Sequence, residues 1–395
     1  MPDRPVIRLR PNRGRRFHEG APWLYADEIV TDRRTKSLAP GAIATLESSE
    51  REPLATVTVN IGSTIVARVL DLDPAAEIGP AWHRARLADA LSLRERLYDS
   101  PFYRLVHAEG DGLPGLVIDR FGAAASIQPN AAWADERAEE IAEALAAVTG
   151  VSTVVLNAGG RARALEGLGG GSRLLRGALD APIEAPMNGA TYLADLIGGQ
   201  KTGLFYDQRP NHAFVARLAE GAEVLDVFSH VGGFALACLA AGAASAVAVD
   251  SSTAALALAA RGAALTGAAG RLEAVKAPAF DAMRDLAAEG RSFDIVISDP
   301  PAFAPNKAAL DKGLRAHETS ARLAAKLVRP GGYLTLCSCS HAATPELFRD
   351  ACGKGIRAAG RAGALIREGR AGPDHPAHFA LPETAYLKAL TYRLS

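Results

Sequence analysis

The segment Val224-Leu225-Asp226-Val227-Phe228-Ser229-His230-Val231-Gly232-Gly233-Phe234 carries the clearest structural signal of the chain. Its first part is an apolar run typical of a buried strand, and a second apolar run begins after the glycines. A strand, a turn with two adjacent glycines and a helix predict the first unit of an α/β domain. Glycines at that turn let a ligand approach the backbone and the helix N-terminus. A turn that needs glycine only for its own geometry would look the same.

The alternation of strand and helix continues to about residue 338. Apolar strand-like runs are predicted at 223–228, 245–249, 271–275, 293–298 and 333–338, with helical patterns at 234–241, 253–266, 282–288 and 309–328. Apolar strands separated by helices are typical of a parallel sheet with helices on both faces, which predicts a doubly wound, Rossmann-like α/β domain. In such a domain ligands bind beyond the carboxyl ends of the strands. The residues that follow each strand are therefore the candidates for a site.

Acidic residues lie at or just beyond the ends of three further strands. Asp250 follows the second, where a carboxylate can accept both ribose hydroxyls of a nucleoside-containing cofactor, NAD or S-adenosylmethionine. Asp281 follows the third, where it can meet an adenine amine or simply begin a helix. The fourth leads into Asp299-Pro300-Pro301-Ala302-Phe303. Two prolines make this loop stiff where a substrate would meet the cofactor, although a structural turn is the alternative.

The first half of the chain has a different pattern. Short alternating runs with turn residues predict a small β-rich domain over residues 1–74. Residues 75–185 are predicted to form an α+β middle domain, with helices at 82–98 and 132–147 and strands at 103–107, 116–119 and 153–157. The doubly wound domain is then expected over residues 186–395.

Composition indicates a soluble globular protein, because 48% of the residues are hydrophobic and 22% are charged. No run approaches the roughly 20 apolar residues of a membrane span, and the N-terminus lacks the apolar core of a signal peptide, so we expect a cytoplasmic protein. Four cysteines do not suggest a disulfide framework. The 44 basic and 44 acidic residues cancel, so any affinity for RNA must be local. Six arginines among the first 16 residues suit phosphate contacts or a solvated basic terminus equally well.

Taken together, these segments resemble class I methyltransferases, and most closely the bacterial 23S ribosomal RNA 5-methylcytosine methyltransferase family. The resemblance covers nearly the whole chain. Pro22-Trp23 in the arginine-rich start resembles that family's PUA domain, and Glu109–Gly115 resembles its middle domain. The loop Lys201-Thr202-Gly203-Leu204-Phe205-Tyr206-Asp207-Gln208-Arg209 matches the most recognisable motif of the family. Asp374-His375-Pro376 and Tyr386-Leu387-Lys388 agree with it as well.

The resemblance implies S-adenosylmethionine as the cofactor and RNA, specifically 23S ribosomal RNA, as the substrate. It implies a cofactor pocket that is capped by Phe205, Asp207 and Arg209. The residues implied around this pocket are Asp226, Phe228, Gly232, Asp250, Asp281 and Asp299. His317 stands where the family commonly has a tyrosine.

A cysteine motif, Cys337-Ser338-Cys339-Ser340, follows the strand at 333–338. Carbon 5 of cytosine is a poor nucleophile, so its methylation requires a thiolate that adds to carbon 6. Alignment with the family's Ser-Cys-Ser motif implies Cys339 as this nucleophile, with Asp299 as the second catalytic residue, bonded to the cytosine edge. Cys337 is expected to be a buried strand residue. The residues expected to contact the substrate are Pro300, Pro301, Phe303 and Lys307. Phe303 would stack on the base, and Lys307 would contact a phosphate.

Other functions stay open at this point. The target could be a guanine amine or another nucleotide, for which no cysteine is needed, or the chain could be a non-catalytic RNA-binding assembly factor. NAD-dependent chemistry is a weaker alternative, because nothing suggests a hydride acceptor site. We predict no metal and no membrane partner. The sequence does not assign the base that removes the carbon 5 proton, and it fixes no oligomeric state, with a homodimer among the options.

Overall fold

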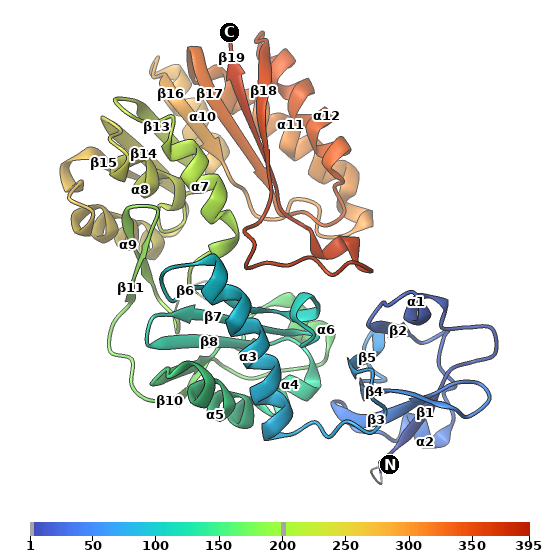
Figure 1. The fold of residues 1–395 in the computed structure, drawn as a ribbon. Helices are drawn as coiled ribbons and strands as arrows, with labels where there is room; N and C mark the ends of the chain where they lie inside the picture. Colours follow the sequence, from blue (N-terminus) through green and yellow to red (C-terminus); the bar gives the residue numbers. More distant parts are fainter. Residues whose placement is uncertain (1–3, 199–202) are drawn as a thin grey trace. The chain divides into compact units, whose positions relative to one another are not determined.

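The computed structural model describes residues 4–198 and 203–395, and Figure 1 shows its helices and strands. Lys201 and Thr202 of the family motif lie outside the described residues. The chain forms two compact units. Unit 1 comprises Met1–Pro182, Asp195–Gly203 and Pro373–Thr384, and unit 2 comprises Ile183–Ala194, Leu204–Gly372 and Ala385–Ser395. Two segments from the second half of the chain thus belong to unit 1.

Unit 1 begins with a five-stranded sheet in the order β1-β3-β4-β5-β2. Its strands are β1 (Val6–Arg8), β2 (Trp23–Tyr25), β3 (Ala42–Glu47), β4 (Pro53–Val59) and β5 (Ile65–Asp71), and the short helices α1 (Arg15–His18) and α2 (Arg33–Lys36) accompany them. Alternate side chains such as Ile7, Leu46 and Val57 form its buried core. The expected β-rich N-terminal fold is confirmed.

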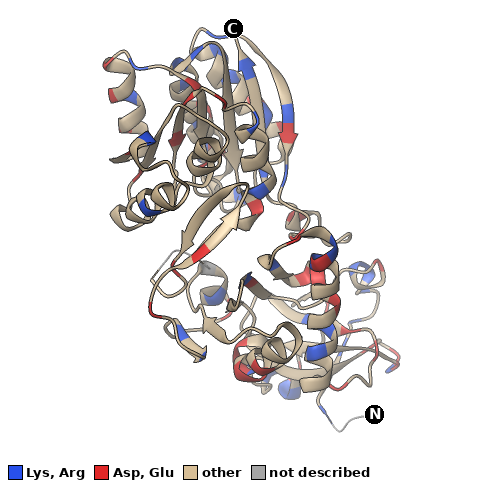
Figure 2. Cartoon of the chain, turned by 60° about the vertical axis from the view of Figure 1, so that its left-hand side comes forward, with Lys and Arg blue, Asp and Glu red and all other residues tan. Residues whose placement is uncertain are grey.

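The arginines of the N-terminus contact unit 1 itself. The guanidinium of Arg4 donates to the hydroxyls of Thr45 and Thr56, at 2.9 and 2.6 Å. Arg8 pairs with Glu47 at 3.1 Å, and Arg10 donates to the carbonyl of Ile29. Figure 2 shows Lys and Arg interspersed with Asp and Glu along both units. Arg4, Arg8 and Arg10 thus contribute to the fold of unit 1. The side chains of Arg13, Arg15 and Arg16 are exposed, and their contact with phosphates stays a prediction.

The rest of unit 1 is a second sheet in the order β10-β9-β8-β7-β6, with helices packed against it. Its strands are β6 (Phe102–His107), β7 (Leu116–Phe121), β8 (Ala124–Pro129), β9 (Thr153–Leu156) and β10 (Arg173–Arg176), and its helices are α3 (Pro80–Leu97), α4 (Ala132–Glu136), α5 (Ala138–Thr149) and α6 (Arg161–Leu165). The single helix expected at 132–147 is wrong, since the chain breaks between α4 and α5 at Arg137. Trp133 is fully buried there, and its indole N–H donates to Pro114. This bond anchors α4 separately from α5.

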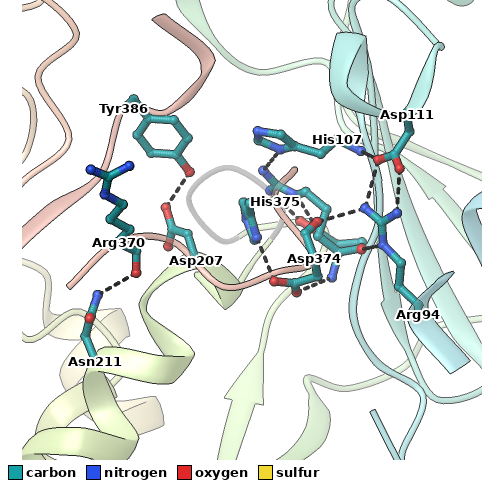
Figure 3. Close-up of polar contacts among 11 residues, drawn as sticks. Arg94, His107, Asp111, Asp207, Asn211, Arg370, Asp374, His375 and Tyr386 are labelled. Atoms are coloured by element: carbon teal, nitrogen blue, oxygen red, sulfur yellow. Dashed lines mark hydrogen bonds and ion pairs between the residues drawn. The ribbon is translucent and has the colours of Figure 1, made fainter. Parts of the chain in front are cut away.

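A buried ionic network joins the segment 373–384 to the second sheet of unit 1. Arg94, on α3, is fully buried and donates to both carboxylate oxygens of Asp111, at 2.5 and 2.8 Å, and to the main-chain oxygen of Asp374. The Asp374 carboxylate accepts from the amide of Arg104 at 3.0 Å and lies 2.9 Å from Nδ1 of His375. Figure 3 shows these side chains converging. The Asp-His-Pro motif thus packs within unit 1.

Unit 2 contains the hairpin β11 (Ile183–Met187) and β12 (Ala190–Ala194) and a seven-stranded sheet in the order β15-β14-β13-β16-β17-β19-β18. The strands are β13 (Glu223–Val227), β14 (Ser245–Asp250), β15 (Leu272–Lys276), β16 (Phe293–Ser298), β17 (Val328–Ser338), β18 (Gly363–Gly369) and β19 (Lys388–Leu394). The doubly wound fold is confirmed, but the sheet is not wholly parallel, because β19 runs antiparallel to β17 and β18. A helix connects β17 to β18, and these two strands are not neighbours in the sheet. The last strand, β19, lies between them.

Helices cover both faces of this sheet (Figure 1). Those on one face are α7 (Arg209–Ala216), α8 (Gly233–Ala240) and α9 (Thr253–Leu265), and those on the other are α10 (Ala279–Ala288), α11 (Leu310–Lys326) and α12 (Pro345–Ala358). Met283, Leu323 and Phe348 of the second group bury against strand residues such as Val296 and Leu336. Among the described residues, no helix combines the length and apolar character needed to cross a membrane. The strand order turns at β13 and β16, so ligands are expected beyond the ends of these strands.

Candidate functional site

The loop that follows β13 has a strained backbone. Phe228 and His230 adopt φ angles of 64° and 50°, and Gly232, with φ of 82°, precedes α8. Side chains other than glycine rarely adopt this left-handed region, and such strain is concentrated at functional sites. Two carboxylates hold the loop, because Asp250 accepts from the amide of His230 and Asp226 from the amide of Ala235, both at 2.9 Å. Predicted cofactor residues thus meet at one turn.

Asp226 has an unusual environment for a carboxylate. It is 1% exposed, and within the described part of the chain its Oδ1 has no hydrogen-bond partner. Burial raises the pKa of this carboxyl to about 7. A buried acceptor without a donor is costly, so the site is suited to a ligand that supplies hydrogen-bond donors or positive charge. S-Adenosylmethionine offers both, in its amino and sulfonium groups, and the residues present therefore fit this cofactor.

Asp250 and Asp281 differ in their surroundings. Both oxygens of Asp250, at the end of β14, accept main-chain hydrogen bonds, from His230 and from Ser252 at 2.8 Å. Its partly exposed carboxylate is held in place and can accept ribose hydroxyls. Asp281 lies in the first turn of α10, where it is exposed and pairs with Arg284. Its assignment to the cofactor pocket stays a prediction, and its contacts are those of a residue that begins a helix.

Three phenylalanine rings form a triangle beyond the strand ends. The ring centroids of Phe228 and Phe280 are 6.2 Å apart, those of Phe228 and Phe303 are 6.2 Å apart, and those of Phe280 and Phe303 are 6.1 Å apart. All three rings are half-buried, so flat groups such as nucleobases can pack against them. The sequence places Phe280 beside Asp281 after the third strand, as a candidate partner for an adenine. In the structure it is the second residue of α10.

The predicted capping residues lie in the short helix η2 (Tyr206–Gln208) and beside it. The ring of Phe205 lies 5.0 Å from the ring of His230, and so contacts the loop after β13. Asp207 is buried and accepts from the hydroxyl of Tyr386 at 2.6 Å, as Figure 3 shows. Arg209 begins α7, and its main-chain oxygen accepts from the side chain of Asn188. The structure therefore brings Phe205 to the cofactor loop and ties Asp207 to the segment before β19.

The structure also brings the proline loop and the cysteine motif together, because β16 and β17 are neighbours. The sulfur of Cys339 lies 4.0 Å from the main-chain oxygen of Pro300. The amide of Ala304 donates to the hydroxyl of Ser340 at 3.0 Å, which ties the two loops further. The amide of Asp299 donates to the carbonyl of Val227, and so links the proline loop to β13.

The four cysteines differ sharply in exposure. Cys339 is half-buried, whereas the other three, Cys238, Cys337 and Cys352, are buried. Burial raises the pKa of each of these three thiols. The thiolate is the reactive form of cysteine, so Cys339 is the one thiol in the described chain that combines access to solvent with a place in the site. Cys337 is buried in β17, as expected.

Two buried basic side chains frame the cysteine motif. His317, on α11, is 3% exposed, and its Nε2 lies 3.1 Å from the hydroxyl of Ser338. Burial, aided by the charge of Lys388, lowers the pKa of His317 to about 4, so its ring is neutral at pH 7. Its ring also contacts Phe303, with centroids 4.9 Å apart, so α11 packs against the proline loop at this point. Lys388, at the start of β19, donates to the carbonyls of Ser340 and Ala343.

The remaining predicted substrate residues lie on the surface. Pro301 is exposed, and so is Lys307, in the short helix η4 (Lys307–Ala309). Their contacts with RNA stay predictions. In the ranges 4–198 and 203–395, no group of three or more His, Cys, Asp or Glu side chains is arranged to hold a metal ion.

Comparisons with known proteins show the family of the chain. The sequence pattern of the S-adenosylmethionine-dependent methyltransferase family matches residues 141–393, and that of a PUA-like domain matches residues 7–72. The ribosomal RNA large subunit methyltransferase I of Shewanella amazonensis is 34% identical over 393 residues, which cover 98% of this chain and 99% of the relative. The protein of the same name from Cronobacter sakazakii is 32% identical, over 93% of both chains.

Solved structures share the fold along nearly the whole chain. A SAM-dependent methyltransferase from Streptococcus mutans covers 98% of this chain and all of its own, with a TM-score of 0.81 and 18% identity. A methyltransferase complexed with SAH has a TM-score of 0.83 and 19% identity over the same shares. The full-length similarity to curated relatives, together with the match of the family pattern, shows that this chain belongs to the S-adenosylmethionine-dependent methyltransferases, in the family of the ribosomal RNA large subunit methyltransferases I.

Proposed function

We propose that this methyltransferase acts on ribosomal RNA of the large subunit and forms 5-methylcytosine in 23S RNA through a covalent bond between Cys339 and the cytosine. The names of the curated relatives support the RNA substrate. The PUA-like match in unit 1 supports it independently, because it lies outside the catalytic domain. The observation that carries the reaction type is the half-buried Cys339, whose sulfur lies 4.0 Å from the carbonyl oxygen of Pro300.

The cofactor supplies an electrophilic methyl group on a sulfonium when it is bound. Asp226 and Asp250 would hold its polar groups, because both carboxylates are fixed at the loop after β13. Phe205 would close the pocket from the side of His230. These residues leave the ends of β16 and β17 for the substrate, so the base would enter between Phe303 and Cys339.

The Cys339 thiolate would add to carbon 6 of the cytosine, forming a carbon–sulfur bond and moving an electron pair towards carbon 5. Asp299 would bond the ring edge and stabilise the proton that its nitrogen takes up. Carbon 5 would thereby become nucleophilic towards the methyl group that the bound cofactor would supply. After methylation, loss of the carbon 5 proton to a base would expel the sulfur from carbon 6 and restore the double bond and the Cys339 thiolate. The ring nitrogen would return its proton to Asp299.

Methylation of 23S RNA by the purified protein tests this function. Nucleoside mass spectrometry of the RNA should show 5-methylcytidine with the wild-type chain and none with Cys339→Ala. Cys352→Ala is the matched control, because Cys352 is buried in α12, outside the site, and its variant should keep activity. Both variants should still bind S-adenosylhomocysteine in calorimetry. A methylated guanine as product would refute the assignment to cytosine, and methylation by Cys339→Ala would refute the covalent step.

A further inference from the structure

Lys388 is a buried cation whose visible partners carry no charge. Its residue is 7% exposed, and its Nζ donates to the main-chain oxygens of Ser340 at 2.7 Å and Ala343 at 2.9 Å. These carbonyls belong to the loop between β17 and α12, the same loop that begins with Cys339. Lys388 itself pairs with Ser338 in the register of β19 and β17, one residue before that cysteine. The ammonium group is therefore enclosed by the loop that carries the predicted nucleophile.

A buried ammonium group is unfavourable unless an opposite charge compensates it. Carbonyl oxygens solvate the charge of Lys388 without neutralising it. Burial lowers the pKa of Lys388 to about 8, and the opposing influence is the charge of Cys339. The anion that best compensates this cation is thus the thiolate form of Cys339, since the two groups interact electrostatically and share one loop.

The other ionisable groups around the pair leave this role to Lys388. His317, on α11, is held neutral at pH 7 and brings no charge. Cys337 is held as a neutral thiol by its burial in β17. The charge of Asp299 acts on Cys337, where it adds to burial in raising the pKa of that thiol. His341 lies in the same loop, where its exposed ring packs 5.4 Å from that of Tyr386.

We propose that Lys388 is a positioning residue that stabilises Cys339 as a thiolate and fixes the loop that presents it to the substrate. An ammonium group favours the anion, which is the nucleophilic form of the side chain. The two hydrogen bonds from Lys388 to the carbonyls of Ser340 and Ala343 also fix the position of the loop. A catalytic role for this thiolate rests on the proposed function. The formation of the thiolate in the free protein does not.

Alkylation of the free protein by iodoacetamide tests the thiolate without RNA or cofactor. Cys339 should be the cysteine that is modified in the folded chain, because the other three are buried, and mass spectrometry after digestion identifies it. The rate should rise with pH around a midpoint about 1 unit or more below the value near 8.5 of an ordinary thiol. In Lys388→Met the midpoint should rise by about 1 unit, and the rate at pH 7 should fall about tenfold.

The pH profile separates this role from a purely structural one. A loop that is merely displaced in Lys388→Met would change the limiting rate at high pH but not the midpoint, and that result overturns the proposal. Lys388→Arg keeps the charge and should retain a midpoint closer to that of the wild type. Lys354→Met, at an exposed position on α12, is the matched control and should leave the profile unchanged.

The wild-type profile decides the matter even if Lys388→Met does not fold, because a midpoint at or above 8.5 overturns the proposal by itself. RNA methylation is measured separately on the same proteins. If the alkylation midpoint of Cys339 is low but the protein forms no 5-methylcytidine, the proposed reaction is refuted and the stabilisation of the thiolate by Lys388 still holds.

Discussion

Replacement of Asp226 by asparagine is expected to stabilise the free protein at neutral pH while it weakens cofactor binding. The cause is the burial of this carboxyl, which raises its pKa from 3.8 to about 7. Between these two values the unfolded chain has released the proton and the folded chain has kept it. Stability therefore falls as pH rises through this window, and the whole penalty is present above pH 7.

The size of this penalty follows from the width of the window. About 3 pH units correspond to about 4 kcal/mol, and this is an upper limit for a residue that the surroundings can relax around. Asparagine has nearly the same shape, cannot ionise, and keeps an oxygen that can accept from the amide of Ala235. Its amide hydrogens would lack acceptors at either pH, so we expect a net gain of about 1 to 3 kcal/mol at pH 8 and a net loss of about 1 to 3 kcal/mol at pH 4.

Urea unfolding of Asp226→Asn and of the wild type at pH 4 and pH 8, without cofactor, measures the effect. Far-UV circular dichroism is the appropriate probe, because the three tryptophans, Trp23, Trp82 and Trp133, all lie in unit 1 and Asp226 lies in unit 2. Asp285→Asn removes the same charge at an exposed position of α10 and should change stability little at either pH. Calorimetry with S-adenosylhomocysteine should show at least about tenfold weaker binding to Asp226→Asn.

Equal differences at both pH values would show that ionisation of Asp226 is not the cause. A variant that is less stable than the wild type at pH 8 would refute the reasoning altogether. Unchanged affinity for S-adenosylhomocysteine would remove Asp226 from the cofactor pocket.

Three further predictions concern packing and acid stability. The pKa of His317 is about 4 in the folded chain and near 6.5 in the unfolded chain, so the free energy of unfolding should fall as pH drops through this window. Between pH 7 and pH 4, urea unfolding of His317→Gln should show a loss of stability smaller by about 3 kcal/mol than that of the wild type. Gly313→Ala would put a Cβ 2.8 Å from the carbonyl oxygen of Phe303, displace that loop, and lower kcat/KM for RNA at least about tenfold in a methyl-transfer assay. Gly355→Ala would collide with the main chain of Glu318 and cost about 2 kcal/mol in urea unfolding. Gly353→Ala, on the same helix, would meet only the flexible end of Arg357 at 3.5 Å and should gain about 1 kcal/mol.

The parts of the fold that follow from local pattern could be predicted. The strand expected at 293–298 is β16, residue for residue, because apolar runs bounded by polar residues mark buried parallel strands clearly. Asp226 and Asp250 could be placed near the cofactor loop for a related reason, since parallel strands end on one edge of the sheet. Local sequence pattern thus predicts the strands and the residues at their ends.

Contacts between residues distant in the chain could not be predicted in this way. Arg94 and Asp374 are 280 residues apart, and nothing in the periodicity of either segment indicates that they meet in unit 1. The break between α4 and α5 depends similarly on a bond from Trp133 to Pro114, on another segment. Such choices are made by packing, which overrides the local preference for a continuous helix.

The last strand shows why the missed features matter for chemistry. A parallel sheet that ended with β17 would leave Cys339 at an open edge, where a thiol is exposed to water on one side. The antiparallel β19 covers that edge and brings Lys388 beneath the loop, so the cysteine gains a buried cation that no segment near it in sequence supplies. The same strand follows Tyr386, which binds Asp207 in the cofactor half of the site. Since one short segment contacts both Asp207 and the loop that begins with Cys339, a change in its register would move the proposed cofactor pocket and the proposed nucleophile together. The reactivity proposed for Cys339 would therefore depend on the complete seven-stranded sheet rather than on the Ser-Cys-Ser motif alone.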